Sequence, residues 1–417
     1  MVDIADSAAV SRAAAKDFTA ERFDARVASR QGDALAPLAE ITAGPWRRLA
    51  QCAVEPNGYY LADWELAVNA SARGRGGVSA LAAWSNASPA PDGTANLIGL
   101  LPVISLWRAC RIPLPALVSA DPYGTLCTPL LDRSMTDDAI VGLMQRARQA
   151  GAHALILRNA ALDGAAIKAF TEILRHDGIR PRVLNSHVRA CLDATRDADE
   201  LLRDALGAKK VKDLRRQRNR LAEHGAIRFE VARTPDEVAT AVETFLTLEA
   251  SGWKAQRGTA LLQDDGDAGF VRRATKALAA TGQCEIVSLR AGDNPVAAAI
   301  VLRHLDRAFY FKLGVDDRFA KLSPGVQLTL DLTRHLCADP AIAMVDSTAS
   351  ADHPMINPIW RGRLAIGDVL VPLRRHDPVV PLITAALSAR RLLREPARRL
   401  VHYLRKHREN TPQEKSS

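Results

Sequence analysis

Cysteine is scarce and scattered in this chain of 417 residues. The six cysteines lie far apart, and the sequence holds no Cys-x-x-Cys pair and no Cys/His cluster at zinc spacing. The ten histidines are equally dispersed and form no His-Glu-x-x-His motif. We therefore expect reduced, mostly buried thiols and no metal site.

Long apolar runs are also missing. No stretch reaches the roughly 18 uncharged apolar residues that a membrane-spanning helix needs. The first residues lack a basic region followed by an apolar run, as a secretory signal would have. The composition, 47% hydrophobic and 25% charged, is typical of a globular protein with two or three cores. The sequence thus predicts a cytoplasmic protein.

The net charge of +9 is concentrated in two segments. Residues 209–220 carry seven Lys/Arg and one Asp, and residues 390–408 carry eight Lys/Arg and one Glu. The first segment is predicted to be a helix with a narrow apolar stripe of Val211, Leu214 and Leu221. Such a helix is usually a solvated face, and the alternatives are binding of an anionic acceptor, a phosphate-linked lipid carrier or RNA. The second segment mixes leucines with cations, which suits a helix on an anionic membrane or a cyclic dinucleotide site.

One order of secondary-structure elements occurs twice along the chain. The first half contains expected strands at 78–84 and 97–106, a helix at 136–150 and a strand at 154–157. The second half contains expected strands at 285–290, 296–302 and 307–313, a helix from Pro324 and a strand at 343–346. We therefore predict an α/β fold with a mixed sheet, built from two similar units.

The predicted organisation has four parts. They are a partly disordered lead-in (1–36), a first lobe (37–200), a second lobe (201–372), and a basic helical extension with a disordered tail (373–417). The join between the lobes is expected near 195–208, where the sequence reads as a capped helix.

The start of the helix after the third strand of the second half contains a glycine, Gly325. A strand at Arg307–Leu313 leads into a loop, and the helix begins at Pro324. The first turn of a helix attracts phosphate, and a glycine lets the phosphate approach closely. The alternative is a plain helix start, with Ser323 as the N-cap and Pro324 in the first helical position. The local sequence leaves both interpretations open.

Several segments resemble one family of acyltransferases. In chain order they are LRRQRNRLAEHG (214–225), FLTLEASGWKAQRG (245–258), NPVAAAIVLRH (294–304), FYFKLGVDDRFAKLSPGVQL (309–328) and VDSTASADHPMINPIWRGR (345–363). They resemble the GNAT domain of proteins similar to the cellulose-biosynthesis protein CelD, also labelled BioF2-like, over about 205–365. A weaker match covers 45–200 through LIGLLPVISL and CTPLLD. The two-lobed arrangement resembles the Fem peptidyltransferases, which are tandem GNAT folds.

The resemblance implies an acyl-CoA site where the strand leads into the helix. In GNAT enzymes this strand diverges from its neighbour, pantetheine lies along it, and the helix start holds the pyrophosphate. Carried over by position, the pantetheine of acetyl-CoA or another acyl-CoA would lie along Lys312, Leu313, Gly314 and Val315. The phosphates would face Ser323, Gly325, Val326 and Gln327. The segment KLSPGVQL departs from the family signature, which has Gln or Arg, two residues, and then Gly-x-Gly or Gly-x-Ala.

Direct acyl transfer to an amine needs a base for the amine proton, a donor for the oxyanion and an acid for the thiolate. The candidates are Asp346 at a strand end, His353 in the polar loop that follows, and Tyr310. A carboxylate at a strand end more often caps a turn, and His353 equally suits a surface loop. Strand alternation places Tyr310 and Lys312 on one face, which we predict to be the cleft face.

Two tryptophans with neighbouring cations are candidate acceptor residues. They are Trp253 with Lys254, after a helix, and Trp360 with Arg361, near the end of the resembling region. A Trp beside a cation suits a glycan or an acidic acceptor, by ring stacking and charge pairing. The alternative is that each Trp anchors its segment to the core.

With the resemblance, these features predict an acyl-CoA-dependent N-acyltransferase. The expected acceptor is an amino sugar or a related exopolysaccharide or cell-envelope precursor, with peripheral contact to anionic membrane through 373–408. One alternative is a Fem-like peptidyltransferase that uses aminoacyl-tRNA, in which the helix at 209–220 would contact RNA. The other is a non-catalytic GNAT-like scaffold that binds anionic membrane or nucleotide.

Overall fold

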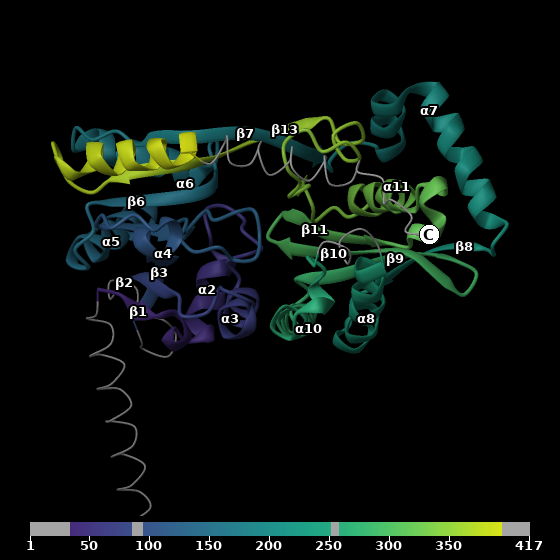
Figure 1. The fold of residues 1–417 in the computed structure, drawn as a ribbon, viewed down its shortest axis with the longest axis horizontal. Helices are drawn as coiled ribbons and strands as arrows, with labels where there is room; N and C mark the ends of the chain where they lie inside the picture. Colours follow the sequence, from purple (N-terminus) through teal and green to yellow (C-terminus); the bar gives the residue numbers. More distant parts are fainter. Residues whose placement is uncertain (1–33, 86–94, 252–257, 394–417) are drawn as a thin grey trace, which may run out of the picture.

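The computed structural model describes residues 34–85, 95–251 and 258–393. In these ranges the chain forms two α/β lobes that lie side by side (Figure 1). One mixed sheet runs through both lobes in the order β1-β2-β3-β4-β6-β13-β7-β12-β11-β10-β9-β8, with β5 paired to β3. The predicted mixed α/β fold is therefore confirmed. No helix in the described ranges is long and apolar enough to cross a membrane.

The first lobe begins with helices that cover a short meander. Its elements are β1 (Ala36–Pro37), α2 (Ala43–Gln51), α3 (Ala62–Ser71), β2 (Ser79–Ser85), β3 (Asn96–Ser105), α4 (Leu106–Cys110), β4 (Ala116–Ser119), β5 (Leu130–Leu131), α5 (Thr136–Gln149), β6 (Ala154–Ala161), α6 (Ala165–His176) and β7 (Arg182–Asp193). Strands β2, β3 and β4 are antiparallel, and β4 runs parallel to β6. Helix α5 is the crossover that a parallel pair requires.

The second lobe repeats this order. Its elements are α7 (Ala198–Ala222), β8 (Ile227–Ala232), α8 (Pro235–Ser251), α10 (Asp265–Ala279), β9 (Cys284–Ala291), β10 (Asn294–His304), β11 (Arg307–Val315), α11 (Pro324–Cys337), β12 (Met344–Asp346) and β13 (Gly362–Pro372). Strands β9, β10 and β11 are antiparallel, and β11 runs parallel to β12 after the crossover helix α11. The meander, helix and parallel strand are thus built twice.

The last strand of each lobe pairs with the other lobe. Strand β7, which ends the first lobe, is antiparallel to β12, with Leu192 opposite Val345. Strand β13, which ends the second lobe, is antiparallel to β6, with Leu370 opposite Ile156. The two exchanged strands also pair with each other. This exchange joins the lobes through backbone hydrogen bonds, and it was not predicted from the sequence.

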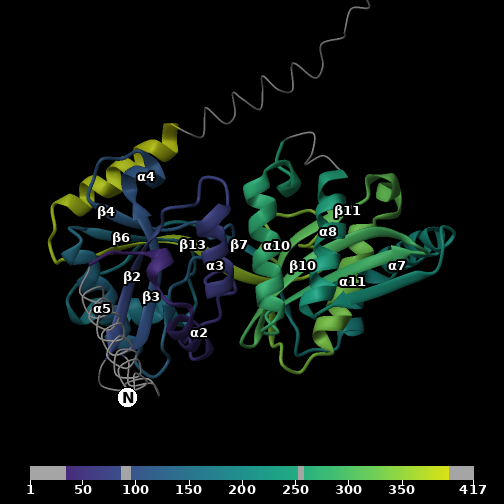
Figure 2. The ribbon, with the colours of Figure 1, turned by 90° about the horizontal axis from the view of Figure 1, so that it is seen from below.

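Aromatic side chains pack the lobes together on one face of the sheet. Trp64 of α3 lies edge-on to Phe270 of α10, with 5.2 Å between ring centroids, and to Phe311 of β11, at 4.8 Å. Tyr59 packs against Phe309 of β11 at 5.7 Å. Figure 2 shows α3 and α10 next to each other where the lobes meet. Each such ring pair adds about 0.5–1.5 kcal/mol beyond the burial of its area.

Helices α7 and α11 cover the opposite face of the second lobe. Helix α7 bends at Gly207, whose backbone is left-handed (φ 70°), and the half that follows carries the basic segment 209–220. Leu214 and Leu221 are buried in the core of this lobe, whereas Val211 is exposed. The predicted apolar stripe therefore includes two of its three residues, and the cations around it face solvent.

A final helix spans residues 379–393 and belongs to the first lobe. Its Val380 and Ile383 are buried against β4, β6 and β13. Most of the basic segment for which we predict membrane contact, residues 394–408, lies outside the described residues, as does the lead-in over 1–33.

Candidate functional site

Strands β11 and β12 pair only over three residues, because β12 ends at Asp346 while β11 continues to Val315. The parallel register joins Arg307, Ala308 and Phe309 to Met344, Val345 and Asp346, and stops there. A cavity of about 330 Å³ lies beside the part of β11 that continues. Its lining residues are Tyr310, Phe311, Lys312, Leu313, Val315, Ser347, Thr348, Ala349, His353, Met355 and Ile356. Five of the predicted site residues therefore lie together.

A β-bulge in β11 changes which side chains share a face. Val301 of β10 is opposite Tyr310, and the residue before it, Ile300, is opposite Lys312. Phe311 therefore has no partner on β10 and is the extra residue of the bulge. Tyr310 consequently faces α11, and Lys312 faces α8. The prediction that Tyr310 and Lys312 share one face is wrong, because strict alternation ends at a bulge.

Tyr310 is buried at the inner wall of the cavity. Its hydroxyl is 3.2 Å from Thr329 Oγ1 on α11, and its ring packs against Trp360 with 5.8 Å between centroids. Burial raises the pKa of Tyr310 to about 12. The phenol therefore stays protonated at neutral pH, and it donates to Thr329 Oγ1, whose own proton goes to the carbonyl oxygen of Gly325 at 2.8 Å.

Lys312 is held by groups from both lobes. Its Nζ donates to Glu249 Oε1 of α8 at 3.2 Å, and the Glu249 side chain is fully buried. The same Nζ lies 5.5 Å from the ring centroid of Tyr123, which follows β4 in the first lobe. Tyr123 in turn donates to Asp267 Oδ2 of α10 at 3.0 Å. The first lobe thus reaches the edge of the cavity in the second.

Asp346 forms a buried ion pair instead of lining the cavity. Its Oδ2 accepts from Arg189 Nη2 of the exchanged strand β7, and its Oδ1 accepts from the backbone N–H of Thr348 at 2.8 Å. Arg189 Nη1 donates to the carbonyl oxygen of Thr125 at 2.7 Å and to its Oγ1 at 2.9 Å. Thr125 Oγ1 donates to the carbonyl oxygen of Thr348. The pair therefore ties β7, β12 and a first-lobe loop to the cavity wall.

His353 lines the cavity with one ring nitrogen already engaged. Its Nδ1 accepts from the backbone N–H groups of Met355 at 3.3 Å and Ile356 at 3.4 Å. Burial lowers the pKa of His353 from its ordinary value. A neutral ring whose Nδ1 is an acceptor carries its proton on Nε2. His353 is consequently arranged as a hydrogen-bond donor.

The start of α11 packs tightly against β11, and this answers why a glycine stands there. A Cβ at Gly325 would lie 2.9 Å from Leu313 Cδ2, 3.1 Å from Val315 Cγ1 and 3.6 Å from Met355 Sδ. Those three side chains all line the cavity. Ser323 sits before the helix in a left-handed conformation (φ 53°), and its side chain makes no capping hydrogen bond. The helix start is therefore brought to the cavity by backbone packing.

The remaining predicted donor-binding residues differ in their exposure to the cavity. A Cβ at Gly314 would lie 2.7 Å from the backbone nitrogen of Glu249, so this glycine lets α8 cross β11. Gln327 is buried, and its Nε2 donates to the carbonyl oxygen of Leu214 of α7 at 2.8 Å. Val326 is partly buried in the core of the second lobe. Only the backbone of these residues is available to a ligand at the helix start.

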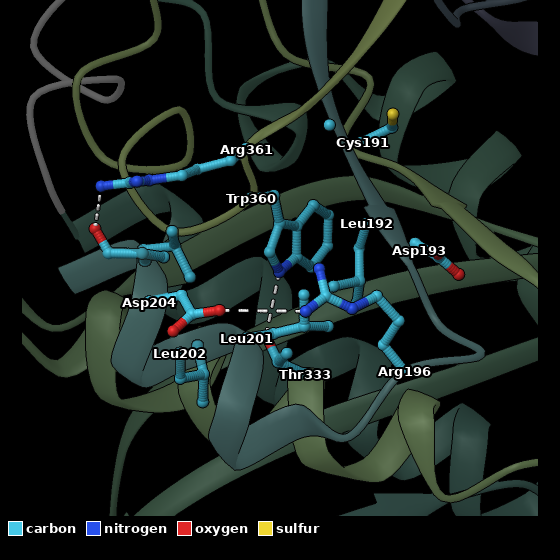
Figure 3. Close-up of a pocket in the computed structure, with 13 residues that line it drawn as sticks. Cys191, Leu192, Asp193, Arg196, Leu201, Leu202, Asp204, Thr333, Trp360 and Arg361 are labelled. Carbon is cyan, nitrogen blue, oxygen red and sulfur yellow. Dashed lines mark hydrogen bonds and ion pairs between the residues drawn. The ribbon is translucent and has the colours of Figure 1, made fainter. Parts of the chain in front are cut away.

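Trp360 and Arg361 border a second cavity of about 190 Å³ beside the start of α7 (Figure 3). Trp360 is fully buried, and its Nε1 donates to Thr333 Oγ1 at 2.9 Å. Arg361 points away from it, and its Nη2 donates to the carbonyl oxygen of Ala205 at 2.6 Å. Because Trp360 also packs against Tyr310, the two rings separate the second cavity from the first. The other predicted acceptor residues, Trp253 and Lys254, lie outside the described residues.

Sequence reasoning missed the residues that support the cavity from elsewhere in the chain. They are Tyr123, Thr125, Arg189, Glu249 and Thr348. Arg189 carried one usable signal, since a lone arginine between apolar residues of a strand calls for a buried partner. In the described ranges, no three His, Cys, Asp or Glu side chains gather in a way that could hold a metal ion.

Comparison with known proteins places this geometry in a fold family. The family model described as "Acetyltransferase (GNAT) domain" matches residues 208–353. The structure of FemX is 11% identical over 83% of this chain and 99% of FemX, with a TM-score of 0.51. Two further structures are similar at lower scores. The C-terminal domain of a protein assigned as a lysylphosphatidylglycerol synthetase from Agrobacterium fabrum is 13% identical over 83% of this chain and 95% of that one, with a TM-score of 0.49. A tandem GNAT protein from the clavulanic acid biosynthesis pathway is 14% identical over 82% and 99%, with a TM-score of 0.38.

No curated protein matches this chain in sequence. The chain has a GNAT-superfamily fold in two tandem lobes, and the acetyltransferase domain model matches within its second lobe. The closer resemblance to CelD-like and BioF2-like proteins stays a prediction.

Proposed function

We propose that this chain is an acyl-CoA-dependent N-acyltransferase that acts on an amino sugar or a related exopolysaccharide or cell-envelope precursor. The observation that carries the proposal is the cavity beside β11 beyond the end of β12, with the start of α11 packed against its lining side chains. A strand edge without a neighbouring strand offers backbone groups to an amide-bearing chain such as pantetheine. A helix start offers N–H groups to phosphate.

The groups proposed to bind phosphate are backbone N–H groups of the first turn of α11. Gly325 is buried, and its missing side chain lets this turn pack against Leu313, Val315 and Met355, which line the cavity. Pro324 lacks an N–H, so Gly325 and Val326 supply the N–H groups of the first turn. An acyl-CoA bound here would supply a thioester carbonyl as the electrophile for an amine. We assign the pantetheine arm to the edge of β11 from Lys312 to Val315.

His353 is the proposed proton donor. It presents Nε2–H, whereas the hydroxyl proton of Tyr310 is donated to Thr329 Oγ1, so Tyr310 is proposed to form the inner wall of the cavity. An Nε2–H group suits stabilisation of a developing oxyanion or protonation of a departing thiolate. Asp346, predicted from the sequence as a base, is proposed to position the cavity wall through Arg189.

The cavity lining has consequences for the acceptor. None of its lining residues is a carboxylate, and His353 Nδ1 is engaged. The amine must therefore arrive largely unprotonated. This favours amines with a pKa near 8, as for an α-amine, over a lysine-like amine with a pKa near 10.4. We propose that the first lobe shapes the acceptor side, because Tyr123 and Thr125 lie at the cavity edge.

The test is release of free CoA from acetyl-CoA in the presence of sugar amines, with the matching N-acetylated sugars as controls. We expect release only with a free amine. His353→Ala should lower kcat about 10²–10³-fold while leaving the melting temperature close to wild type. The absence of amine-dependent release across sugar, amino-acid and polyamine acceptors would overturn the proposal.

A Fem-like reaction with aminoacyl-tRNA is the second candidate, and one observation favours it. The half of α7 after the bend at Gly207 exposes Lys209, Lys212 and Arg215, whose side chains make no ion pair among the described residues. Binding of tRNA that weakens steeply with salt, and that Arg215→Ala with Arg216→Ala weakens further, would support it. Equal binding by wild type and this variant would count against it.

Peripheral contact with the inner face of the membrane is part of the proposal. The helix at 379–393 exposes Leu382, Leu392 and Leu393 next to cations. This pattern is typical of helices that lie on anionic membranes. A non-catalytic scaffold would show the same contact without any donor binding.

A further inference from the structure

Another cleft lies at the end of the first lobe, away from the two cavities described above. It has a volume of about 680 Å³ and lies between the turn that joins α6 to β7 and the turn that follows β13. These turns are adjacent because the start of β7 pairs with the end of β13, with Arg182 opposite Leu370. Four arginines line it, namely Arg180, Arg182, Arg374 and Arg375, and we call it the arginine cleft.

The positive charge of the arginine cleft is poorly balanced. Arg180 and Arg182 are exposed and have no hydrogen bond or ion pair among the described residues. Arg375 Nε donates to the ring nitrogen Nε2 of His376 at 3.0 Å, which leaves its guanidinium charge unpaired. Arg374 Nη1 donates to a backbone carbonyl at 3.0 Å. Four arginines thus line one concavity, and three of them have no carboxylate partner among the described residues.

Asp377 is the acid among the lining residues, and it is already engaged. Its side chain is 3% exposed, and its Oδ2 lies 2.8 Å from His153 Nδ1. Its Oδ1 accepts from the backbone N–H of Val379 at 2.9 Å. Arg374 Nη1 is 4.0 Å from the same carboxylate. Asp377 therefore fixes the turn and offers little charge to the arginines facing the cleft.

The rim of the arginine cleft is held in a fixed shape. Prolines occupy four lining positions, 181, 372, 378 and 381. Gly178 has a left-handed backbone (φ 67°), and a Cβ there would lie 3.5 Å from Arg375 Cζ. Proline and the turn geometry restrict the backbone before any ligand binds. A rigid rim reduces the entropy that binding would cost.

We propose that the arginine cleft binds a phosphate-bearing ligand larger than a single phosphate ion. Guanidinium groups match phosphate oxygens in bidentate geometry, and several of them in one cleft can contact one such ligand together. A volume of about 680 Å³ lies within the range of small-molecule sites, so a single phosphate would fill little of it. Binding also relieves the repulsion among the four arginines.

The surroundings offer two sources for such a ligand. The cleft is bordered by the start of the helix at 379–393, which packs on α4 through a shared apolar core. Figure 2 shows α4 beside this helix. Leu382 is 59% exposed and Trp107 of α4 is 51% exposed, as expected of residues that meet a lipid surface. The phosphate therefore comes either from a lipid headgroup or from a soluble diphosphate such as a nucleotide.

The experiment has two arms that separate these sources. The first measures binding of inorganic pyrophosphate by calorimetry and by the shift in melting temperature. The second measures sedimentation of the protein with phosphatidylglycerol vesicles and with phosphatidylcholine vesicles. The variant Arg182→Ala with Arg375→Ala removes two charges from the arginine cleft. Lys168→Ala with Arg203→Ala removes the same charge from exposed positions of α6 and α7 and is the matched control.

We expect wild type and the control variant to bind alike and the cleft variant to bind at least about tenfold more weakly. Tight pyrophosphate binding with no preference between vesicles assigns a soluble ligand. Preference for phosphatidylglycerol that the cleft variant loses assigns a lipid headgroup. The proposal is overturned if wild type binds neither pyrophosphate nor phosphatidylglycerol vesicles, or if the cleft variant binds as tightly as wild type or loses no more affinity than the control. Pyrophosphate held at the start of α11 would be kept by the cleft variant, so this result is independent of the proposed acyl transfer.

Discussion

Removing one partner of the buried pair between Arg189 and Asp346 should weaken the whole protein. Both side chains are fully buried, and they join the exchanged strand β7 to β12. In Asp346→Asn the guanidinium of Arg189 keeps its bonds to Thr125 but loses its counter-charge. The amide also keeps only one acceptor oxygen, which cannot serve both Arg189 Nη2 and the backbone N–H of Thr348.

The magnitude follows from the burial. Breaking a buried pair by removing one partner costs about 3–5 kcal/mol, because the other charge stays in a low-dielectric interior. For a lobe of 150–250 residues, each kcal/mol lowers the melting temperature by about 2–4 °C, so we expect a fall of about 6–20 °C. Replacing both partners, as Arg189→Met with Asp346→Leu, should recover most of this loss.

The assay is thermal unfolding followed by circular dichroism, together with CoA release at a temperature where all variants are folded. An Asp346→Asn protein that melts within about 2 °C of wild type would refute the energetic reasoning. The double variant separates two roles for Asp346. If it folds and keeps most of its activity, Asp346 positions the wall; if it folds like wild type and is inactive, Asp346 takes part in the chemistry.

Three further substitutions test other parts of the structure. Burial lowers the pKa of His304 to about 4, below its usual 6.5. Neutral His304 therefore stabilises the folded state fully above about pH 6.5, and this stabilisation is lost as the pH falls toward 4. Melting temperature should therefore drop steeply over that range and less steeply in His304→Gln; parallel curves would contradict this. Gly314→Ala should lower the free energy of unfolding by about 1–3 kcal/mol, because the added Cβ overpacks the contact with α8. Gly269→Ala should not destabilise the protein, because nothing lies within 4 Å of its Cβ. Equal melting temperatures for the two variants would contradict the close approach of α8. Trp360→Phe and Trp360→Ala should open the wall beside Tyr310. The affinity for octanoyl-CoA relative to acetyl-CoA should then rise by about tenfold or more. An unchanged ratio of these affinities would show that the two cavities stay separate.

The repeated strands and helices could be predicted within a few residues because their patterns are local. Strands β9, β10 and β11 have alternating or continuous apolar runs and are separated by turns at 291–294 and 304–307. Helix α5 was predicted at 136–150 and spans Thr136–Gln149. Such signals depend on residues that are close in sequence.

The exchange of β7 and β13 could not be predicted in the same way. The first half of β7, residues 182–188, is mostly exposed and polar. Its sequence therefore lacks the apolar alternation of a half-buried strand. Its partner β13 begins 169 residues after β7 ends. The pairing is decided by the docking of two lobes, which a local pattern does not record.

The residues of the candidate site that one segment contributes could be predicted from the sequence. The residues that other parts of the chain contribute could not. Tyr310, Lys312, Leu313, Val315 and His353 line one cavity. These residues could be predicted because four of them lie on a single strand. The bulge at β11 and the partners on α8, β7 and the first lobe arise from tertiary packing, so alternation gave the wrong faces.

The central claim is that the start of α11 faces a bound acyl-CoA, and thermal unfolding with acetyl-CoA tests it most directly. The proteins to compare are wild type, Gly325→Glu, which places a carboxylate at the helix start, and Gly269→Glu, which adds the same charge on α10 where there is room. At 100 times the dissociation constant, ligand should stabilise wild type and Gly269→Glu by about 2.7 kcal/mol. The account predicts no such shift for a folded Gly325→Glu protein. If all three proteins respond equally, or none does, α11 does not hold the donor.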